Sequence, residues 1–196
     1  MHGWLDYFHE DLIINVGEGR HRLMISDESS SISIGAAGSP AVLAKSSLTN
    51  IKEGLGDIHF SAEGGHWSAG FNLWLGNNSD YLSVVSVPAN TDGSGLRTAT
   101  SVHAGSGNDE LTVSLDASTH YGVIFVANGQ AGNDLINGSL SSVPMVLFGD
   151  GGDDHLITGS GKLFCRWQQL LARQERVIFQ HSFVVQSAYV LCFSYF

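Results

Sequence analysis

The sequence predicts an all-β protein whose chain coils through stacked parallel rungs, with about one Gly-Asp turn in each rung of 20–29 residues. Three observations predict this fold class. The 196 residues include 24 Gly and only 3 Pro, a mixture that suits tight turns between strands. Short β-type runs recur between turn signals, and one Gly-Asp motif recurs several times along the chain.

Seven segments have the composition of strands, and several alternate apolar and polar side chains as half-buried strands do. In chain order they are residues 12–16, 23–26, 71–75, 81–87, 111–115, 123–127 and 143–148. Gly, Asn, Asp and Ser residues separate these runs, which is typical of strands joined by turns.

The net charge and the short apolar stretches of the chain argue against nucleic-acid binding and against a membrane span. The chain carries 19 acidic and 9 basic side chains, a formal charge of −10, whereas nucleic-acid-binding surfaces need concentrated positive charge. No stretch reaches the roughly 18 consecutive apolar residues that a membrane span requires. The first residues lack a basic region followed by an apolar run, so they do not indicate a secretory signal. We therefore expect neither nucleic acid nor a membrane span.

Composition divides the chain near residue 161. Residues 1–161 hold every glycine and predict the coiled β unit, whereas residues 162–196 hold none and carry an excess of basic side chains. The spacing of Leu163, Trp167 and Leu170 predicts a helix over 163–178, followed by a β-prone end. This atypical tail is either a cap on the coil or an extension that is not its natural continuation, such as a shifted reading frame produces.

A repeated motif is the most specific feature of the sequence. The segments 104–113, 129–138 and 149–159 each contain a Gly-rich hexad that ends in Asp, with an aliphatic residue two places later. Weaker copies occur upstream. Residues 75–84 keep the aspartate but have Asn78 in place of a glycine, and residues 16–25 have a histidine where the aspartate would stand.

These hexads resemble the G-G-x-G-x-D-x-U-x repeats of the RTX, or hemolysin-type calcium-binding, family. The resemblance is close over residues 103–159 and is absent from the tail. It implies a right-handed parallel β-helix or β-roll with calcium in its turns. It also implies a secreted or cell-surface protein in which the repeats are structural or adhesive. The aligned aspartates, at 80, 109, 134 and 154, are 29, 25 and 20 residues apart, which predicts one such turn per rung.

The same site follows from the chemistry of stacked turns. Gly at alternate hexad positions permits positive φ, which we expect to turn carbonyl oxygens inward. Rungs about 4.8 Å apart would allow one Ca²⁺ to reach oxygens of two turns at about 2.3–2.6 Å. Carboxylates stacked without a cation repel, so we expect folding and calcium binding to be coupled. The predicted ligand residues are Asp80, Gly105, Gly107, Asn108, Asp109, Gly132, Asn133, Asp134, Gly149, Gly152, Asp153 and Asp154.

The leading interpretation is a non-enzymatic module, because the recognisable residues are repeated turn elements. The alternative is a polysaccharide-acting enzyme, lyase-like or epimerase-like, on a β-helix. Its best local concentration of polar groups is Asp57, His59, Glu63 and His66. Trp67 and Trp74 are candidates to line a sugar-binding groove, although we expect Trp74 to pack in a strand core. Surface polysaccharide or neighbouring repeats of a larger chain are the expected partners besides calcium. Cys165 and Cys192 predict neither a disulfide framework nor a zinc site.

Overall fold

The computed structural model describes residues 5, 8–89, 96–161, 163–166, 176–178 and 190–193. In these residues the fold is all-β, as the sequence predicts, and contains no helix. No helix in the described part is therefore long and apolar enough to cross a lipid bilayer.

Two large sheets contain most of the described strands. The first holds β1 (Leu12–Val16), β4 (Ala41–Ala44), β5 (Ser47–Thr49), β6 (Ile58–Ala62), β9 (Tyr81–Val84), β11 (Glu110–Val113), β13 (Leu135–Asn137), β15 (His155–Ile157) and β17 (Arg176–Ile178). The second holds β3 (Leu23–Ser26), β8 (Phe71–Trp74), β10 (Thr98–His103), β12 (Val123–Ala131), β14 (Met145–Gly151), β16 (Leu163–Arg166) and β18 (Val190–Phe193). A small third sheet pairs β2 (Gly19–Arg20) with β7 (Gly65–His66).

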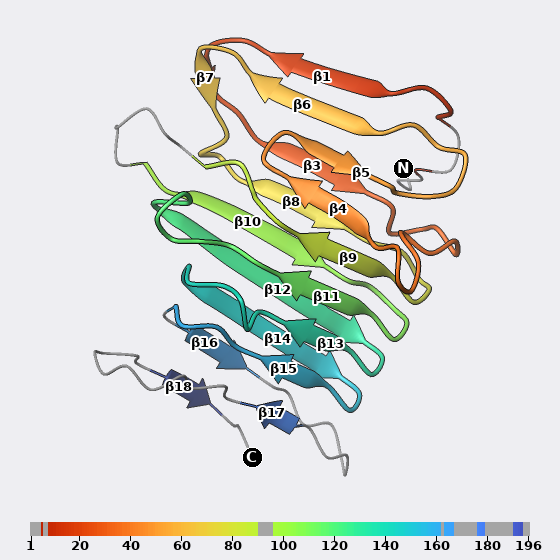
Figure 1. The fold of residues 1–196 in the computed structure, drawn as a ribbon, viewed down its shortest axis with the longest axis vertical. Coiled ribbons are helices and arrows are strands. Elements are labelled where there is room, and N and C mark those ends of the chain that lie inside the picture. The colour runs from red at the N-terminus through yellow and green to blue at the C-terminus, as the bar shows by residue number, and fades with distance from the viewer. Residues whose placement is uncertain are drawn as a thin grey trace.

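From β8 to β15 the chain alternates strictly between the two large sheets. Each new strand pairs in parallel with the strand two places earlier, so successive passages lie one above the other (Figure 1). The N-terminal part departs from this rule, because β5 pairs antiparallel with both β4 and β6. All seven predicted strand segments coincide with strands of the structure, to within a few residues at their ends.

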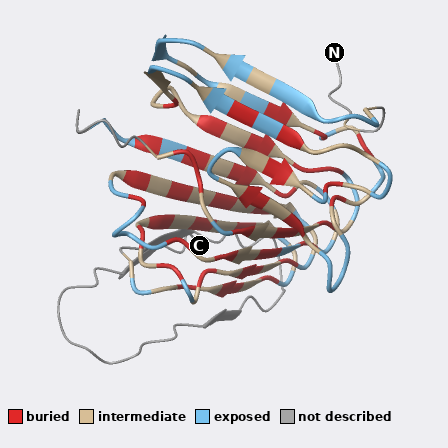
Figure 2. Ribbon diagram, turned by 45° about the horizontal axis from the view of Figure 1, so that its top comes forward, coloured by how far each residue is buried: buried red, intermediate tan, exposed pale blue. Residues whose placement is uncertain are grey.

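The core lies between the two large sheets and is filled by alternate residues of the strands from β8 to β15, together with β4 (Figure 2). One row of inward-facing residues, paired in register across four strands of the first sheet, illustrates how the core is filled. Leu82, Leu111, Ile136 and Leu156 follow one another through β9, β11, β13 and β15, and none is more than 2% exposed. The aliphatic residue two places after each aspartate of the repeat therefore points into the core. Burying each of these side chains contributes about 1.5–3 kcal/mol.

The helix predicted over 163–178 is wrong at both of its ends. Leu163–Arg166 is strand β16 and Arg176–Ile178 is strand β17, while residues 167–175 lie outside the described residues. The two strands pair in parallel with β14 and β15. β14 and β15 offer unpaired N–H and C=O groups at their edges. Hydrogen bonding to these groups stabilises strands more than the helical spacing of the apolar side chains stabilises a helix.

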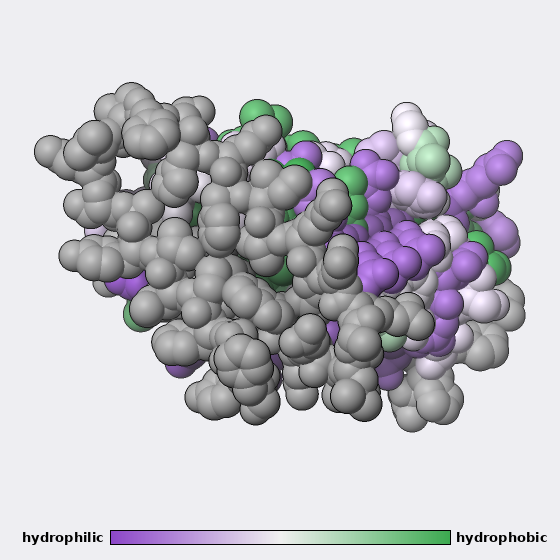
Figure 3. Space-filling model, turned by 90° about the horizontal axis from the view of Figure 1, so that it is seen from below, coloured by the Kyte–Doolittle hydropathy of each residue, from purple (hydrophilic) through white to green (hydrophobic). Residues whose placement is uncertain are grey.

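Seen from below, the described side chains that are visible are mainly hydrophilic, with scattered hydrophobic ones (Figure 3). The proposed division of the chain near residue 161 stays a prediction.

Candidate functional site

The predicted aspartates form a column through the stacked turns. Asp109 Oδ1 accepts the N–H of Asp80 at 2.7 Å, Asp134 Oδ1 accepts that of Asp109 at 2.9 Å, and Asp154 Oδ1 accepts that of Asp134 at 2.9 Å. Each carboxylate therefore bonds to the backbone of the turn before it. The turns lie in vertical register, although 29, 25 and 20 residues separate the aspartates in the sequence. We call these four residues the aspartate column.

The second oxygen of three of these carboxylates is buried without a partner. Asp109, Asp134 and Asp154 are only 2%, 2% and 3% exposed, and their Oδ2 atoms make no hydrogen bond. Within the described part of the chain, none of the three forms an ion pair. A buried carboxylate oxygen without a donor is costly, so the column is incomplete without a proton or a cation.

The electrostatics of the column follow from this burial. Desolvation raises the pKa of Asp109 to about 8 and that of Asp134 to about 6, and it also raises the pKa of Asp154. In each case the hydrogen bond from the preceding backbone N–H opposes the shift. The neighbouring carboxylates Asp134 and Asp80 raise the pKa of Asp109 further. The folded chain therefore holds these negative charges at a cost.

Asp80 differs from the other three members of the column. Its Oδ1 accepts the N–H of Ile34 at 2.6 Å and its Oδ2 accepts the N–H of Gly76 at 2.9 Å, so both oxygens have donors. Burial still raises the pKa of Asp80 to about 6. Asn78, which stands where the other turns have a glycine, does not take a positive φ. Asp80 continues the stack but has no unpartnered oxygen to offer a metal.

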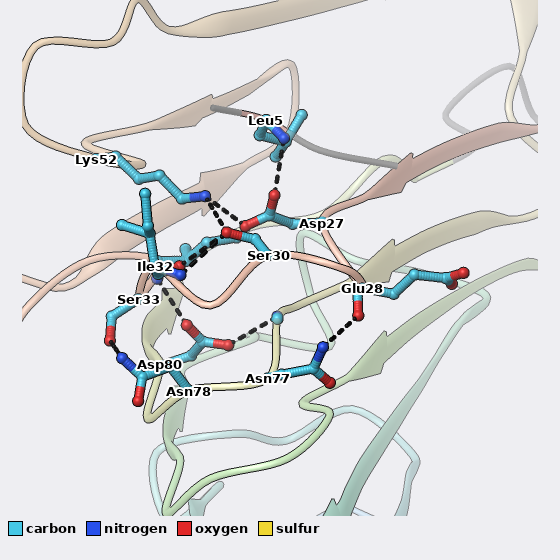
Figure 4. A network of polar contacts seen from close by, with 12 residues as sticks. Leu5, Asp27, Glu28, Ser30, Ile32, Ser33, Lys52, Asn77, Asn78 and Asp80 are labelled. Atoms are coloured by element: carbon cyan, nitrogen blue, oxygen red, sulfur yellow. Dashed lines mark hydrogen bonds and ion pairs between the residues drawn. The ribbon is translucent and has the colours of Figure 1, made fainter. Parts of the chain in front are cut away.

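A neighbouring network places a basic side chain at this end of the column (Figure 4). Lys52 Nζ lies 2.6 Å from Asp27 Oδ2 and 3.0 Å from Ser30 Oγ. The Lys52 and Asp27 side chains are 5% and 0% exposed. An ammonium group thus offsets the buried carboxylate of Asp27, and its charge also lowers the pKa of Asp80. Among the residues that the structure describes, no basic side chain pairs in this way with the three aspartates further along the chain.

The predicted ligands next to the aspartates form a second, exposed column. Asn108 Oδ1 accepts the N–H of Asn133 at 2.8 Å, and Asn133 Oδ1 accepts the N–H of Asp153 at 2.8 Å. These bonds run toward the following turn, opposite to those of the aspartate column. Because Asn108, Asn133 and Asp153 are exposed and the two amide oxygens are engaged, they stabilise the stacking and do not face a buried ion.

The glycines of the turns are required by close stacking. Gly105, Gly107, Gly132 and Gly152 have φ of 99°, 128°, 142° and 143°. A Cβ on Gly132 or Gly152 would overlap the carbonyl oxygen of the aligned glycine in the turn before. The carbonyls of Gly107 and Gly132 therefore point toward the next turn, and that of Gly105 accepts the N–H of Ala131 at 3.0 Å. Hydrogen bonding and packing between turns therefore direct the carbonyls of Gly105, Gly107 and Gly132 along the stack. An inward-facing carbonyl at Gly149 or Gly152 stays a prediction.

Two other glycines make room for the carboxylates themselves. A Cβ on Gly149 would overlap Asp154 Oδ2, and one on Gly129 would overlap Asp134 Oδ2. Gly149 therefore serves the predicted site by lacking a side chain. Sequence reasoning missed Gly129, although it stands five residues before its aspartate as Gly149 does.

The two tryptophans of the suggested sugar groove occupy different places. Trp67 is 9% exposed and belongs to the core, where its ring meets Phe60 edge-on. Trp74 does not pack in a strand core as expected, because Phe71 and Leu73 take the inward positions of β8. It stacks instead on His103, with ring centroids 3.9 Å apart.

The polar residues of the enzyme alternative are only partly brought together. Asp57 and His59 lie beside Asp11, whereas Glu63 and His66 are not in that group. His66 Nδ1 instead lies 2.7 Å from Ser68 Oγ. The four residues therefore do not form one catalytic group.

Comparisons with protein-family models, with curated proteins and with solved structures find no match for the chain. The functional argument therefore depends on the geometry of the site.

Proposed function

We propose that this chain is a calcium-dependent structural module of a secreted or cell-surface protein, built as a right-handed parallel β-helix. One observation carries the proposal. Three buried carboxylate oxygens, on Asp109, Asp134 and Asp154, stand in successive turns without a hydrogen-bond donor or an ion-pair partner. A bound cation supplies the charge that this arrangement lacks.

The stacked topology supports the β-helix. The chain passes alternately through two parallel sheets, and each passage adds one strand to both. Between β8 and β15, each passage from the second sheet to the first contains one aspartate of the column, and each rung pairs with its neighbours, as in other coiled repeat proteins. Repetition of this kind favours a structural role over a catalytic one, which needs unique residues.

The chemistry of the site favours calcium. The available side-chain donors are carboxylate oxygens, which hard cations prefer, and calcium accepts irregular sets of 6–8 oxygens. Asp109, Asp134 and Asp154 would hold the ion, and it would supply positive charge between adjacent turns. The carbonyl groups of Gly105, Gly107 and Gly132 are engaged between turns, so water or rearranged main chain would complete the set.

Thermal unfolding of the full chain, followed by circular dichroism, tests the proposal. We expect the melting temperature to rise on adding millimolar Ca²⁺ and to fall on adding a chelator, because only the folded column gathers the carboxylates. Mg²⁺ at the same concentration should stabilise less, since it demands regular octahedral geometry. Identical unfolding curves with calcium and with chelator would show that the column binds no calcium.

A further inference from the structure

A second group of metal-ligand side chains lies at the N-terminal edge of the first sheet, where β1 and β6 run side by side (Figure 1). Asp11, Asp57 and His59 each offer one ligand atom, and the three atoms lie within 4.8 Å of one another. Asp11 Oδ2 is 3.7 Å from His59 Nε2. We propose that these three residues bind a transition-metal dication of the zinc class at this edge.

Strand pairing brings the three residues together. β1 and β6 are parallel, with Leu12 opposite Ile58 and Ile13 opposite His59, so Asp11 and Asp57 precede one register pair on adjacent strands. Alternation then directs Asp57 and His59 to one side of β6, while the intervening Ile58 is 1% exposed in the core. The position of the group is therefore set by the sheet and not by a loose loop.

Main-chain hydrogen bonds orient both carboxylates. Asp11 Oδ1 accepts the N–H of Asp57 at 2.9 Å, and Asp57 Oδ1 accepts the N–H of Asn50 at 3.1 Å. One oxygen of each carboxylate is thus held by the backbone, in the manner of the outer-shell bonds that orient metal ligands. This arrangement limits the rotation of each carboxylate before any metal binds.

The dimensions suit a small dication. With metal–ligand bonds of about 2.0–2.2 Å, the ligand atoms of a tetrahedral zinc site lie roughly 3.4 Å apart. The separation of 3.7 Å between Asp11 and His59 is already close to this value. Their side chains are 58% and 46% exposed, so they can move the remaining distance and water can supply a further ligand.

The histidine distinguishes this group from the aspartate column. Calcium takes oxygen ligands, whereas an imidazole nitrogen with two carboxylates suits zinc, cobalt or nickel. The two metal proposals therefore predict different ions at opposite parts of the chain. Sequence reasoning noted Asp57 and His59 but missed Asp11, because 46 residues separate it from Asp57.

Metal titration of the full chain in saturating Ca²⁺ tests the inference. We expect one equivalent of Co²⁺ to bind with visible d–d absorption and to be displaced by Zn²⁺, which calorimetry measures. His59→Gln and Asp11→Asn should each weaken Zn²⁺ binding by roughly 10- to 100-fold. Asp11→Asn keeps an acceptor for the Asp57 N–H, and Glu10→Gln removes a neighbouring exposed charge as the matched control.

Absence of Co²⁺ and Zn²⁺ binding would overturn the inference. So would equal binding by all variants, because the metal would then lie on other histidines of the chain. Loss of Zn²⁺ binding in His59→Gln and Asp11→Asn but not in Glu10→Gln, with unchanged circular dichroism, supports it. Since calcium is present throughout, failure of this site leaves the calcium dependence of folding as a separate result.

Discussion

Asp134→Asn removes one charge from the aspartate column with little change in its shape. The asparagine oxygen can still accept the N–H of Asp109, which lies 2.9 Å from the present carboxylate. An NH₂ group replaces the buried Oδ2 that has no partner. The variant therefore separates the effect of charge from the effect of hydrogen bonding between turns.

The pKa of Asp134 determines how much the charge on this side chain destabilises the folded chain. Burial raises the pKa of Asp134 from 3.8 to about 6, so the folded chain binds this proton more tightly than the unfolded chain. Without calcium, this group must then lower the stability by roughly 3 kcal/mol in total as the pH rises from well below 3.8 to well above 6, and about 2 kcal/mol of that loss falls between pH 4.5 and pH 8. The variant has no such group. Any cost of its buried NH₂ is independent of pH and cancels in the comparison.

Urea denaturation in chelator, near pH 4.5 and near pH 8, measures the difference. We expect the loss of stability between the two conditions to be smaller by about 2 kcal/mol in Asp134→Asn than in the parent chain. Glu110→Gln removes an exposed charge next to the column and should leave the loss unchanged. We also expect Ca²⁺ to stabilise Asp134→Asn less than the parent. An unaltered pH dependence in Asp134→Asn would refute the assignment of a costly buried charge to this position.

Three further substitutions test the stacking by the same urea denaturation. Gly132→Ala should destabilise the fold by more than about 2 kcal/mol, because its Cβ would overlap a carbonyl of the turn before and its φ is 142°. Gly17→Ala, which meets no atom within 4 Å, is the control. Lys52→Met should cost about 3–5 kcal/mol by removing an ammonium from a buried carboxylate, whereas Lys45→Met, at an exposed position, should cost little. Asn133→Ala should cost about 1 kcal/mol, because it loses one hydrogen bond to the following turn. Equal stabilities for Gly132→Ala and Gly17→Ala would contradict the close stacking of the turns.

Much of the fold could be predicted because the longer strands carry their own sequence signal. Alternation in segments such as 111–115 marks the strand and its inward face, and the spacing of the aspartates marks the register. Short strands such as β13 and β15 have three residues each, too few for a periodic pattern to show. The helix over 163–178 was wrong because its apolar spacing is local, whereas pairing with β14 and β15 is not.

The candidate site could be predicted only in part. Repetition identifies the aspartates, but which oxygen remains without a donor depends on the direction of single peptide groups. At Asp80 the amide of Gly76 reaches the second oxygen, and in the three later turns no amide does. The aligned positions Gln130 and Asp150 have φ of 72° and 64°, whereas Gly76 is not among the residues with positive φ. Sequence patterns do not report such conformational differences.

The two side-chain columns give the coil a modular length. Each turn offers its aspartate to the turn before and its asparagine to the turn after. If one whole rung were removed and the rungs on either side were joined, the turns of those two rungs would become neighbours. The N–H groups and side-chain oxygens that had bonded to the lost rung would then find the same kind of partner in each other's turn. Gain or loss of complete rungs is thus a conservative change for this architecture, whereas gain or loss of part of a rung is not.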